Sequence, residues 1–315
     1  MEVLTNDPAV LILGVGVTDV KGIFGTTLAA RLAYPDRVIE TPLSELALTG
    51  ACAGLALGGY KPILVHARAD FLFLTFEHLV NTIAKWPYTS GGPGLPIVVR
   101  AIIGRGWGQG AQHSQAPYAM LAHVPGLRVV VPVTGQSYRR FLAEALTEGR
   151  PTIMFEPRRC YAREMDALVP ALTGEHDLDI ITIGDAVLDA VALLPWLAQQ
   201  GIRAGIISWE DLSQPPPFTG RPCLVIDGAA PGRFGAGAEA IAHYMAQYPT
   251  GVPRIRRLGV SFSPCPVSAP LEAAWYISRE QIIQAACKVL GYDAPYYPER
   301  AAPAPIGRDG REQPF

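Results

Sequence analysis

Short apolar runs rich in β-branched residues alternate with longer segments of helical periodicity through the first half of this chain. The short runs, which we expect to be strands buried on both faces, are residues 10–13, 62–65, 96–99, 127–131 and 152–155. The segments with helical periodicity are residues 45–57, 71–85, 114–123 and 135–147. This alternation predicts a parallel sheet that is covered by helices on both faces.

A second α/β unit is expected after a break in the pattern. Residues 156–176 carry prolines and charges without clear periodicity, and we interpret them as the connection between two domains. Beyond it we expect strands at 178–183, 202–209 and 223–226, and helices at 186–199 and 236–245. Ser278 and Gln281 fit a capping box, which predicts a last helix that ends near residue 290.

The sequence therefore predicts an α/β protein with two doubly wound domains. We expect the first domain to span residues 1–160, a linker to span 161–176, and the second domain to span 177–293. The tail, residues 294–315, is rich in Pro, Arg and Gly and is expected to be extended or partly disordered.

Composition narrows the possible partners and location. With 49% hydrophobic and 17% charged residues, the chain is expected to bury large surfaces, including one between subunits. The net charge of -2 favours neither a nucleic-acid nor a membrane partner. The start of the chain lacks a basic leader, and its first apolar run is too short to span a bilayer. The 5 scattered cysteines have no metal-ligand spacing, so we expect a reduced, cytoplasmic protein.

Three polar segments interrupt the apolar pattern: residues 41–45 (Thr-Pro-Leu-Ser-Glu), 90–92 (Ser-Gly-Gly) and 108–115 (Gly-Gln-Gly-Ala-Gln-His-Ser-Gln). Glu45 would open a helix with Ser44 as its N-cap, a place where a carboxylate complements the helix dipole without any further function. His113 would lie in a loop before a helix capped by Ser114, where a histidine can equally be structural.

Together these segments resemble the β subunit of the thiamine-diphosphate-dependent 2-oxo acid dehydrogenases (E1β), the transketolase-like pyrimidine-binding family to which split transketolases also belong. The resemblance extends over residues 11–290 and includes Phe234-Gly235-Ala236 at the start of a helix. It implies a pyrimidine-binding domain followed by a transketolase C-terminal-like domain.

The resemblance implies a role for each of several residues. Glu45 would meet N1′ of the aminopyrimidine of thiamine diphosphate, where a carboxyl with a raised pKa can share a proton with the ring. Phe71, otherwise an ordinary buried aromatic residue, would stack on that ring, and Leu43 would line it. His113 would act on the substrate side of the cofactor, in proton transfer or in orienting the intermediate. Three further candidates for the substrate side are Arg100, Gln112 and Gln115.

The chain departs from the family pattern at several places, two of which lie in short motifs. The family usually has Gly-Glu-Glu-Val after the first strand, where this chain has Gly14-Val15-Gly16-Val17. The family's Val-Glu-Glu in the second domain is here Ile226-Asp227-Gly228. Two reactions therefore stay open: E1-type chemistry on a 2-oxo acid, with transfer to lipoamide, and transketolase- or acyloin-type transfer of an acyl or two-carbon unit from a 2-oxo acid or ketose to another acceptor.

The residues that bind the diphosphate are expected on another chain. Relatives hold it through Mg²⁺ bound by a Gly-Asp-Gly segment and a later Asn, but the asparagines here are Asn6 and Asn81, and neither follows such a segment. We therefore expect no metal ligands in this chain and an α-type partner that supplies them, in an α2β2 heterotetramer with a β–β contact. A lipoyl acyltransferase is a further possible partner of such an assembly.

Two alternatives belong to other functional classes. The first is a non-catalytic scaffold or regulatory paralogue of E1β, which loss of Glu45 or His113 would have favoured. The second is an ordinary dinucleotide-binding protein. Gly14-Val15-Gly16 begins the Gly-x-Gly-x-x-Gly pattern of that class, but position 19 is Asp rather than Gly.

Overall fold

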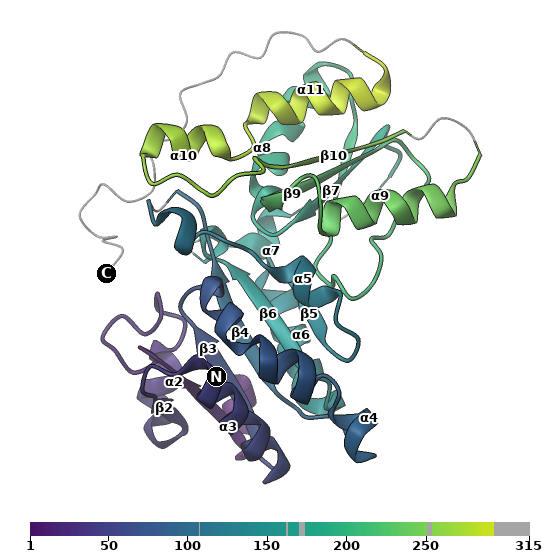
Figure 1. Cartoon of the computed structure of the whole chain (residues 1–315). Helices are drawn as coiled ribbons and strands as arrows, with labels where there is room; N and C mark the ends of the chain where they lie inside the picture. The colour runs from purple at the N-terminus through teal and green to yellow at the C-terminus, as the bar shows by residue number, and fades with distance from the viewer. Residues whose placement is uncertain (107, 162, 170–173, 251–253, 293–315) are drawn as a thin grey trace. The chain divides into compact units, whose positions relative to one another are not determined.

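The computed structural model describes residues 1–106, 108–161, 163–169, 174–250 and 254–292, so the predicted tail lies outside the described residues. The described residues form two compact units (Figure 1). Unit 1 comprises Met1–Ile103 and Pro117–Glu156. Unit 2 comprises Gly104–Ala116 and the chain from Pro157 onward. Within the described residues, no helix is long and apolar enough to cross a membrane.

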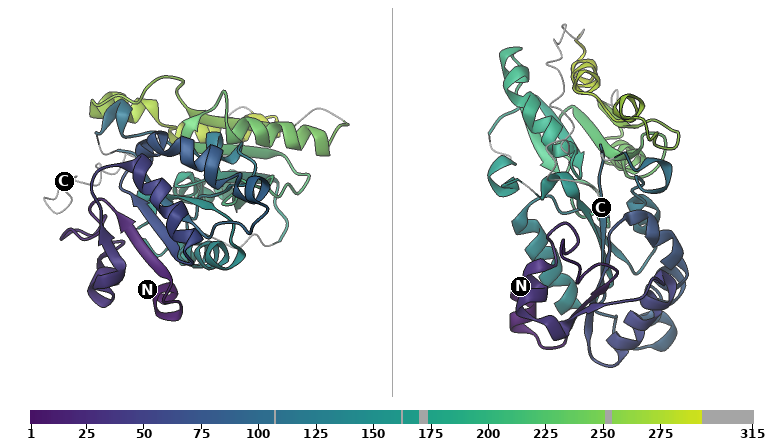
Figure 2. Two further views of the ribbon diagram at one scale, coloured as in Figure 1. Left: turned by 60° about the horizontal axis from the view of Figure 1, so that its bottom comes forward. Right: turned by 90° about the vertical axis from the view of Figure 1, so that its left-hand side faces the viewer.

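Unit 1 is built on a 6-stranded sheet with the order β2-β1-β3-β4-β6-β5. Neighbouring strands run parallel in the pairs β1–β2, β1–β3, β3–β4 and β5–β6. In the right-hand view of Figure 2, helices of this unit lie on both sides of the strands. The strands are β1 (Val10–Gly14), β2 (Val38–Glu40), β3 (Lys61–His66), β4 (Val98–Ile103), β5 (Arg128–Val130) and β6 (Thr152–Pro157).

The helices of unit 1 are mostly short. The helix α3 spans Glu45–Leu57, as predicted, and α6 spans Gly135–Glu148, one residue longer than predicted. The remaining helical elements are α1 (Glu2–Asn6), α2 (Leu28–Ala33), the 3-10 helix η1 (Pro35–Arg37), α4 (Trp86–Ser90) and α5 (Tyr118–Ala122).

The predicted helix at 71–85 is helical over most of its length but is not a regular α-helix. A 3-10 helix, η2 (Ala69–Thr75), is followed by a π-helix, η3 (Glu77–Ile83). The Thr75 hydroxyl donates to the Leu72 carbonyl at 2.8 Å, a local bond that competes with the regular α-helical ladder. Periodicity detected a helical segment here but could not distinguish the three helix types.

The predicted helix at 114–123 begins four residues late. Ser114 is buried and caps no helix, a 3-10 helix, η4, occupies Gly110–Gln112, and α5 starts at Tyr118 after Pro117. A residue that precedes proline is driven out of the α region, so Ala116 cannot continue a helix into Pro117. The proline therefore sets the start of the helix.

Unit 2 is built on a 4-stranded parallel sheet with the order β10-β9-β7-β8. The helix α8 packs against β7, β8 and β9, whereas α9 packs against β9 and β10. The two sheets confirm the predicted fold class of two doubly wound α/β domains. The strands are β7 (Leu178–Ile183), β8 (Ala204–Ser208), β9 (Cys223–Pro231) and β10 (Ile255–Val260).

The last helix of unit 2 confirms the predicted capping box. The Ser278 hydroxyl accepts from the Gln281 N–H at 3.1 Å, and the Ser278 N–H donates to Gln281 Oε1 at 2.8 Å. The interpretation of 156–176 as an irregular connection overlooked η5 and α7, two short helices within it. The helical elements are η5 (Arg158–Cys160), α7 (Met165–Leu168), α8 (Ala186–Gln199), α9 (Ala236–Gln247), α10 (Ala269–Trp275) and α11 (Arg279–Leu290).

Candidate functional site

The strand order of unit 1 reverses direction at β1, which lies between β2 and β3. In doubly wound sheets, ligands bind at the carboxyl edge beside such a reversal. Two candidate residues follow the strands that flank β1. Glu45 begins α3 after β2, and Phe71 lies in η2 after β3. Because α3 packs against η2, these two residues lie on neighbouring elements at the same edge.

Glu45 is half-buried at the first position of α3. Ser44 occupies the predicted N-cap position, but its side chain makes no capping hydrogen bond. The Glu45 main-chain carbonyl accepts a hydrogen bond from Thr49 Oγ1 at 2.8 Å. Leu43 is 76% exposed and Leu46 is 46% exposed. The carboxyl is therefore flanked by apolar side chains that a ligand or another chain could cover.

A second carboxylate at this edge, Glu40, has no signal in the sequence. It ends β2 and accepts hydrogen bonds from the Gly16 N–H at 2.5 Å, the Thr18 N–H at 3.0 Å and Thr18 Oγ1 at 2.9 Å. Partial burial works to raise the pKa of Glu40, but these donors outweigh it and hold the pKa below its usual range. Glu40 thus ties the loop that follows β1 to the end of β2.

The end of β1 must be a glycine for steric reasons. A Cβ at Gly14 would lie 2.4 Å from the Val65 carbonyl oxygen on the neighbouring strand β3. The close approach of the two strands at this edge therefore excludes every side chain from position 14.

His66 ends β3 at the same edge and is another residue that the sequence did not single out. The side chain is buried, and its Nε2 has no hydrogen-bond partner among the described residues. Burial lowers the pKa of His66 to about 4, because a charged imidazolium is costly away from water. His66 is therefore a neutral ring at physiological pH.

Arg100, a candidate for the substrate side, lies in β4 and forms a buried ion pair within unit 1. Its Nε donates to Glu156 Oε1 at 2.5 Å and its Nη2 donates to Glu156 Oε2 at 2.9 Å. The guanidinium also lies 5.6 Å from the centre of the Tyr138 ring. The observed bidentate pair is structural, and a role toward a substrate stays a prediction.

His113 belongs to unit 2, in the segment Gly104–Ala116. Its Nδ1 lies 2.5 Å from the Gln112 carbonyl oxygen, which can only accept a hydrogen bond, so Nδ1 carries a proton. In the neutral ring, Nε2 is then the nitrogen that can take up a proton. Gln112 and Gln115 are both exposed on the same segment.

The predicted site residues are divided between the two units. Unit 1 contains Leu43, Glu45, Phe71 and Arg100, and unit 2 contains Gln112, His113 and Gln115.

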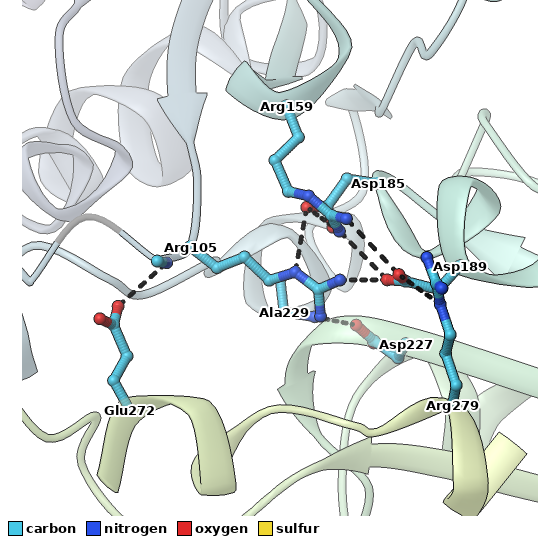
Figure 3. A network of polar contacts seen from close by, with 9 residues as sticks. Arg105, Arg159, Asp185, Asp189, Asp227, Ala229, Glu272 and Arg279 are labelled. Atoms are coloured by element: carbon cyan, nitrogen blue, oxygen red, sulfur yellow. Dashed lines mark hydrogen bonds and ion pairs between the residues drawn. The ribbon is translucent and has the colours of Figure 1, made fainter. Parts of the chain in front are cut away.

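Unit 2 contains a network of charged side chains that includes Arg105 of the segment Gly104–Ala116 (Figure 3). Arg105 and Arg159 both pair with Asp185 and Asp189, and the Arg159 Nη1 lies 3.1 Å from Oδ2 of each aspartate. Burial works to raise the pKa of Asp189, but the charges of Arg105 and Arg159 outweigh it and lower the pKa. The network joins the segment 104–116 to the start of α8.

Comparison with known proteins gives one family and a set of similar chains. The family model described as "Transketolase, pyrimidine binding domain" matches residues 1–163. The β subunit of acetoin:2,6-dichlorophenolindophenol oxidoreductase from Cupriavidus necator is 32% identical over 318 residues, which cover 91% of this chain and 93% of that protein. The β subunit of the pyruvate dehydrogenase E1 component from Leifsonia xyli is 29% identical, with 92% of each chain covered.

A solved structure shares the fold of this chain. It is described as a split-gene transketolase, an inactive β4 tetramer, and superposes with a TM-score of 0.69. The alignment covers 93% of this chain and 95% of that chain at 19% sequence identity. This similarity supports the two-domain α/β architecture.

Proposed function

The chain belongs to the transketolase pyrimidine-binding-domain family, and on that basis we propose that it is the E1β-like, pyrimidine-binding subunit of a two-subunit thiamine-diphosphate enzyme. The observation that carries the proposal is the position of Glu45. This residue offers a half-buried carboxyl at the carboxyl edge of the sheet, on a helix that packs against the element that contains Phe71.

The residues around Glu45 fit the aminopyrimidine half of thiamine diphosphate. The Glu45 carboxyl would share a proton with N1′ of that ring, Phe71 would stack on the ring, and Leu43 would cover it. When bound, the cofactor supplies the nucleophilic carbon that attacks a carbonyl substrate. Placing the ring between apolar side chains excludes water, which strengthens the hydrogen bond to Glu45.

His113 would act on the substrate rather than on the cofactor. With Nδ1 bound to the Gln112 carbonyl, Nε2 can take up a proton from a substrate hydroxyl or return it. Gln112 and Gln115 are polar neighbours on the same segment and would bind substrate oxygens, and Arg100 is the remaining candidate for that side.

We assign the diphosphate and its Mg²⁺ to an α-type partner. The asparagines of this chain, Asn6 and Asn81, do not follow a Gly-Asp-Gly segment of the kind that holds Mg²⁺ in the family. Two exposed leucines of α3, Leu46 next to Glu45 and Leu57 at the other end of the helix, would provide apolar contacts for the partner.

Two aromatic side chains of unit 2 are exposed, Phe234 by 67% and Phe262 by 61%. We propose that they contribute to a contact with a second copy of this chain. This contact would complete an α2β2 heterotetramer.

The proposed reaction is cleavage of the bond next to a carbonyl of a 2-oxo acid or ketose, with transfer of the acyl or two-carbon unit. E1-type and transketolase- or acyloin-type transfer both fit the catalytic residues, because they differ in the acceptor. Asp227 and Gly228 replace an acidic pair of the family in unit 2, so we favour transfer to a lipoyl acyltransferase less than transfer to another acceptor.

Two further proposals concern the whole chain. We propose that its domains span residues 1–160 and 177–293, and that the protein is cytoplasmic.

Affinity purification of this chain from its own cell extract tests the proposal. We expect an α-type chain with a Gly-Asp-Gly segment and a later Asn to co-purify in equal amount. A lipoyl acyltransferase in the same fraction would select the dehydrogenase, and its absence would select the transketolase-like enzyme. Recovery of the chain as a homo-oligomer without such a partner would contradict the split-site proposal.

A further inference from the structure

The glycine-rich segment that contains His113 is held at its backbone by one carboxylate of unit 2. Glu272, in α10, accepts a hydrogen bond from the Gly106 N–H on Oε1 at 3.0 Å and one from the Gly108 N–H on Oε2 at 3.2 Å. Figure 3 shows the Glu272 side chain directed toward this segment beside Arg105. Glu272 is only 4% exposed, and a buried carboxylate is stable only when its oxygens receive such donors.

The backbone of the segment adopts a conformation that suits this arrangement. Gly106 and Gly108 have φ values of +74° and +65°, in the left-handed region that favours glycine. Their two N–H groups, from alternate residues, meet the two oxygens of the same carboxylate. Backbone N–H groups that converge in this way form a site for an anion, and here the anion is the side chain of Glu272.

The same stretch of unit 2 contacts the segment again closer to His113. A Cβ at Gly110 would lie 2.5 Å from Cγ2 of Val267, so the backbone at Gly110 packs directly against the Val267 side chain. The His113 N–H then donates to the Gly110 carbonyl at 3.4 Å, and Nδ1 meets the Gln112 carbonyl. The ring of His113 is thus oriented by local backbone groups, and the path of that backbone is fixed by residues that follow β10.

We propose that Glu272 is a positioning residue that holds the segment 104–116 so that Nε2 of His113 is presented to the substrate. This inference rests on the proposed role of His113. A glutamine at position 272 has nearly the same shape but offers one oxygen and one NH2 group. One of the two glycine N–H groups would then face a donor, and the segment would have to move.

Hydrogen exchange tests the contact without any measurement of activity. In the complex of this chain with its partner, we expect amide exchange in peptides that cover 104–116 to be at least roughly tenfold faster in Glu272→Gln than in wild type. The control is Glu280→Gln, which changes an exposed carboxylate of the same unit and should leave exchange unchanged. Unchanged exchange in Glu272→Gln would overturn the proposal. If that variant does not fold, Glu272→Asp, which keeps both acceptor oxygens but withdraws them by one methylene, must show the faster exchange instead.

A double-mutant cycle tests whether Glu272 acts through His113. We expect Glu272→Gln to lower kcat roughly tenfold, with cofactor affinity kept within about twofold. In a His113→Ala background the same substitution should have no further effect, because the group that it positions is gone.

The outcomes separate this inference from the proposed function. An equal loss of kcat in both backgrounds, or no loss in either, would overturn the role of Glu272 while leaving that of His113 intact. If His113→Ala alone leaves kcat unchanged, the catalytic role of His113 fails, and the positioning role of Glu272 fails with it.

Discussion

The guanidinium of Arg100 and the carboxylate of Glu156 form a bidentate ion pair inside unit 1, with 2.5 Å between Nε and Oε1 and 2.9 Å between Nη2 and Oε2. The pair links β4 to β6, which are neighbours in the sheet. Arg100 is 4% exposed and Glu156 is 2% exposed, so neither charge is solvated by bulk water. Each buried charge is therefore stabilised by its partner in the pair rather than by water.

This dependence predicts a strongly non-additive pair of substitutions. Arg100→Met and Glu156→Gln should each lower the free energy of unfolding by about 3–5 kcal/mol, because each leaves one buried charge without its partner. The double variant Arg100→Met/Glu156→Gln should lose much less than the sum, because it removes both charges. Urea unfolding of the four proteins measures the cycle, and additive losses would contradict the account.

The buried His66 predicts a loss of stability in mild acid. Its folded pKa, about 4, lies below the ordinary value of 6.5, so the unfolded chain binds more protons between these two pH values. Stability from the neutral ring is complete above pH 6.5 and should fall by roughly 3 kcal/mol as the pH drops through this window to the folded pKa. His66→Leu should remove this component, measured as the unfolding free energy at several pH values. A variant that keeps the full pH dependence of wild type would show that another group titrates.

Glu45→Gln should abolish most turnover without loss of the complex. The amide keeps the size of the side chain but cannot exchange a proton with N1′, so we expect kcat to fall at least roughly 100-fold. Glu77→Gln, which changes an exposed carboxylate of the same unit, is the matched control and should retain full activity. Steady-state kinetics and size-exclusion chromatography of the complexes measure the two quantities. Near-normal turnover by Glu45→Gln would refute the proposed role.

His113→Ala should affect the chemical step and spare cofactor binding. We expect carbon–carbon bond cleavage to slow at least roughly tenfold, since a positioned acid–base group typically contributes roughly 100-fold or more. His243→Ala, which removes an exposed histidine of α9 in the same unit, should react at the wild-type rate. Single-turnover kinetics with saturating thiamine diphosphate separates the two steps. A defect confined to cofactor affinity would place His113 on the cofactor rather than the substrate.

The strongly periodic parts of the fold could be read from the sequence. The bounds of α3, β7 and α8 agree with the predicted ones, because long apolar runs that end at turn residues leave little choice. The missed strands had weaker patterns. The strand β2 has only 3 residues, and β10 contains Arg256 and Arg257 beside its apolar positions, so neither reads as a buried run.

The candidate site was only partly predictable. Glu45 and His113 were proposed as site residues because their motifs resemble those of a known family, and these roles stay predictions. His66 gave no signal beyond a polar residue at the end of a strand. Glu272 could not be found, because its contact with Gly106 joins residues 166 positions apart. For the same reason the sequence did not show that the segment Gly104–Ala116 groups with unit 2. Such long-range contacts follow from the packed fold rather than from local pattern.

The most direct test of the split-site account is a calorimetric titration with thiamine diphosphate and Mg²⁺, performed on this chain alone and on its complex with the co-purified α-type chain. We predict weak or undetectable binding by the chain alone and tight, Mg²⁺-dependent binding by the complex, because the diphosphate ligands lie on the partner. Tight, metal-dependent binding by the isolated chain would contradict the account.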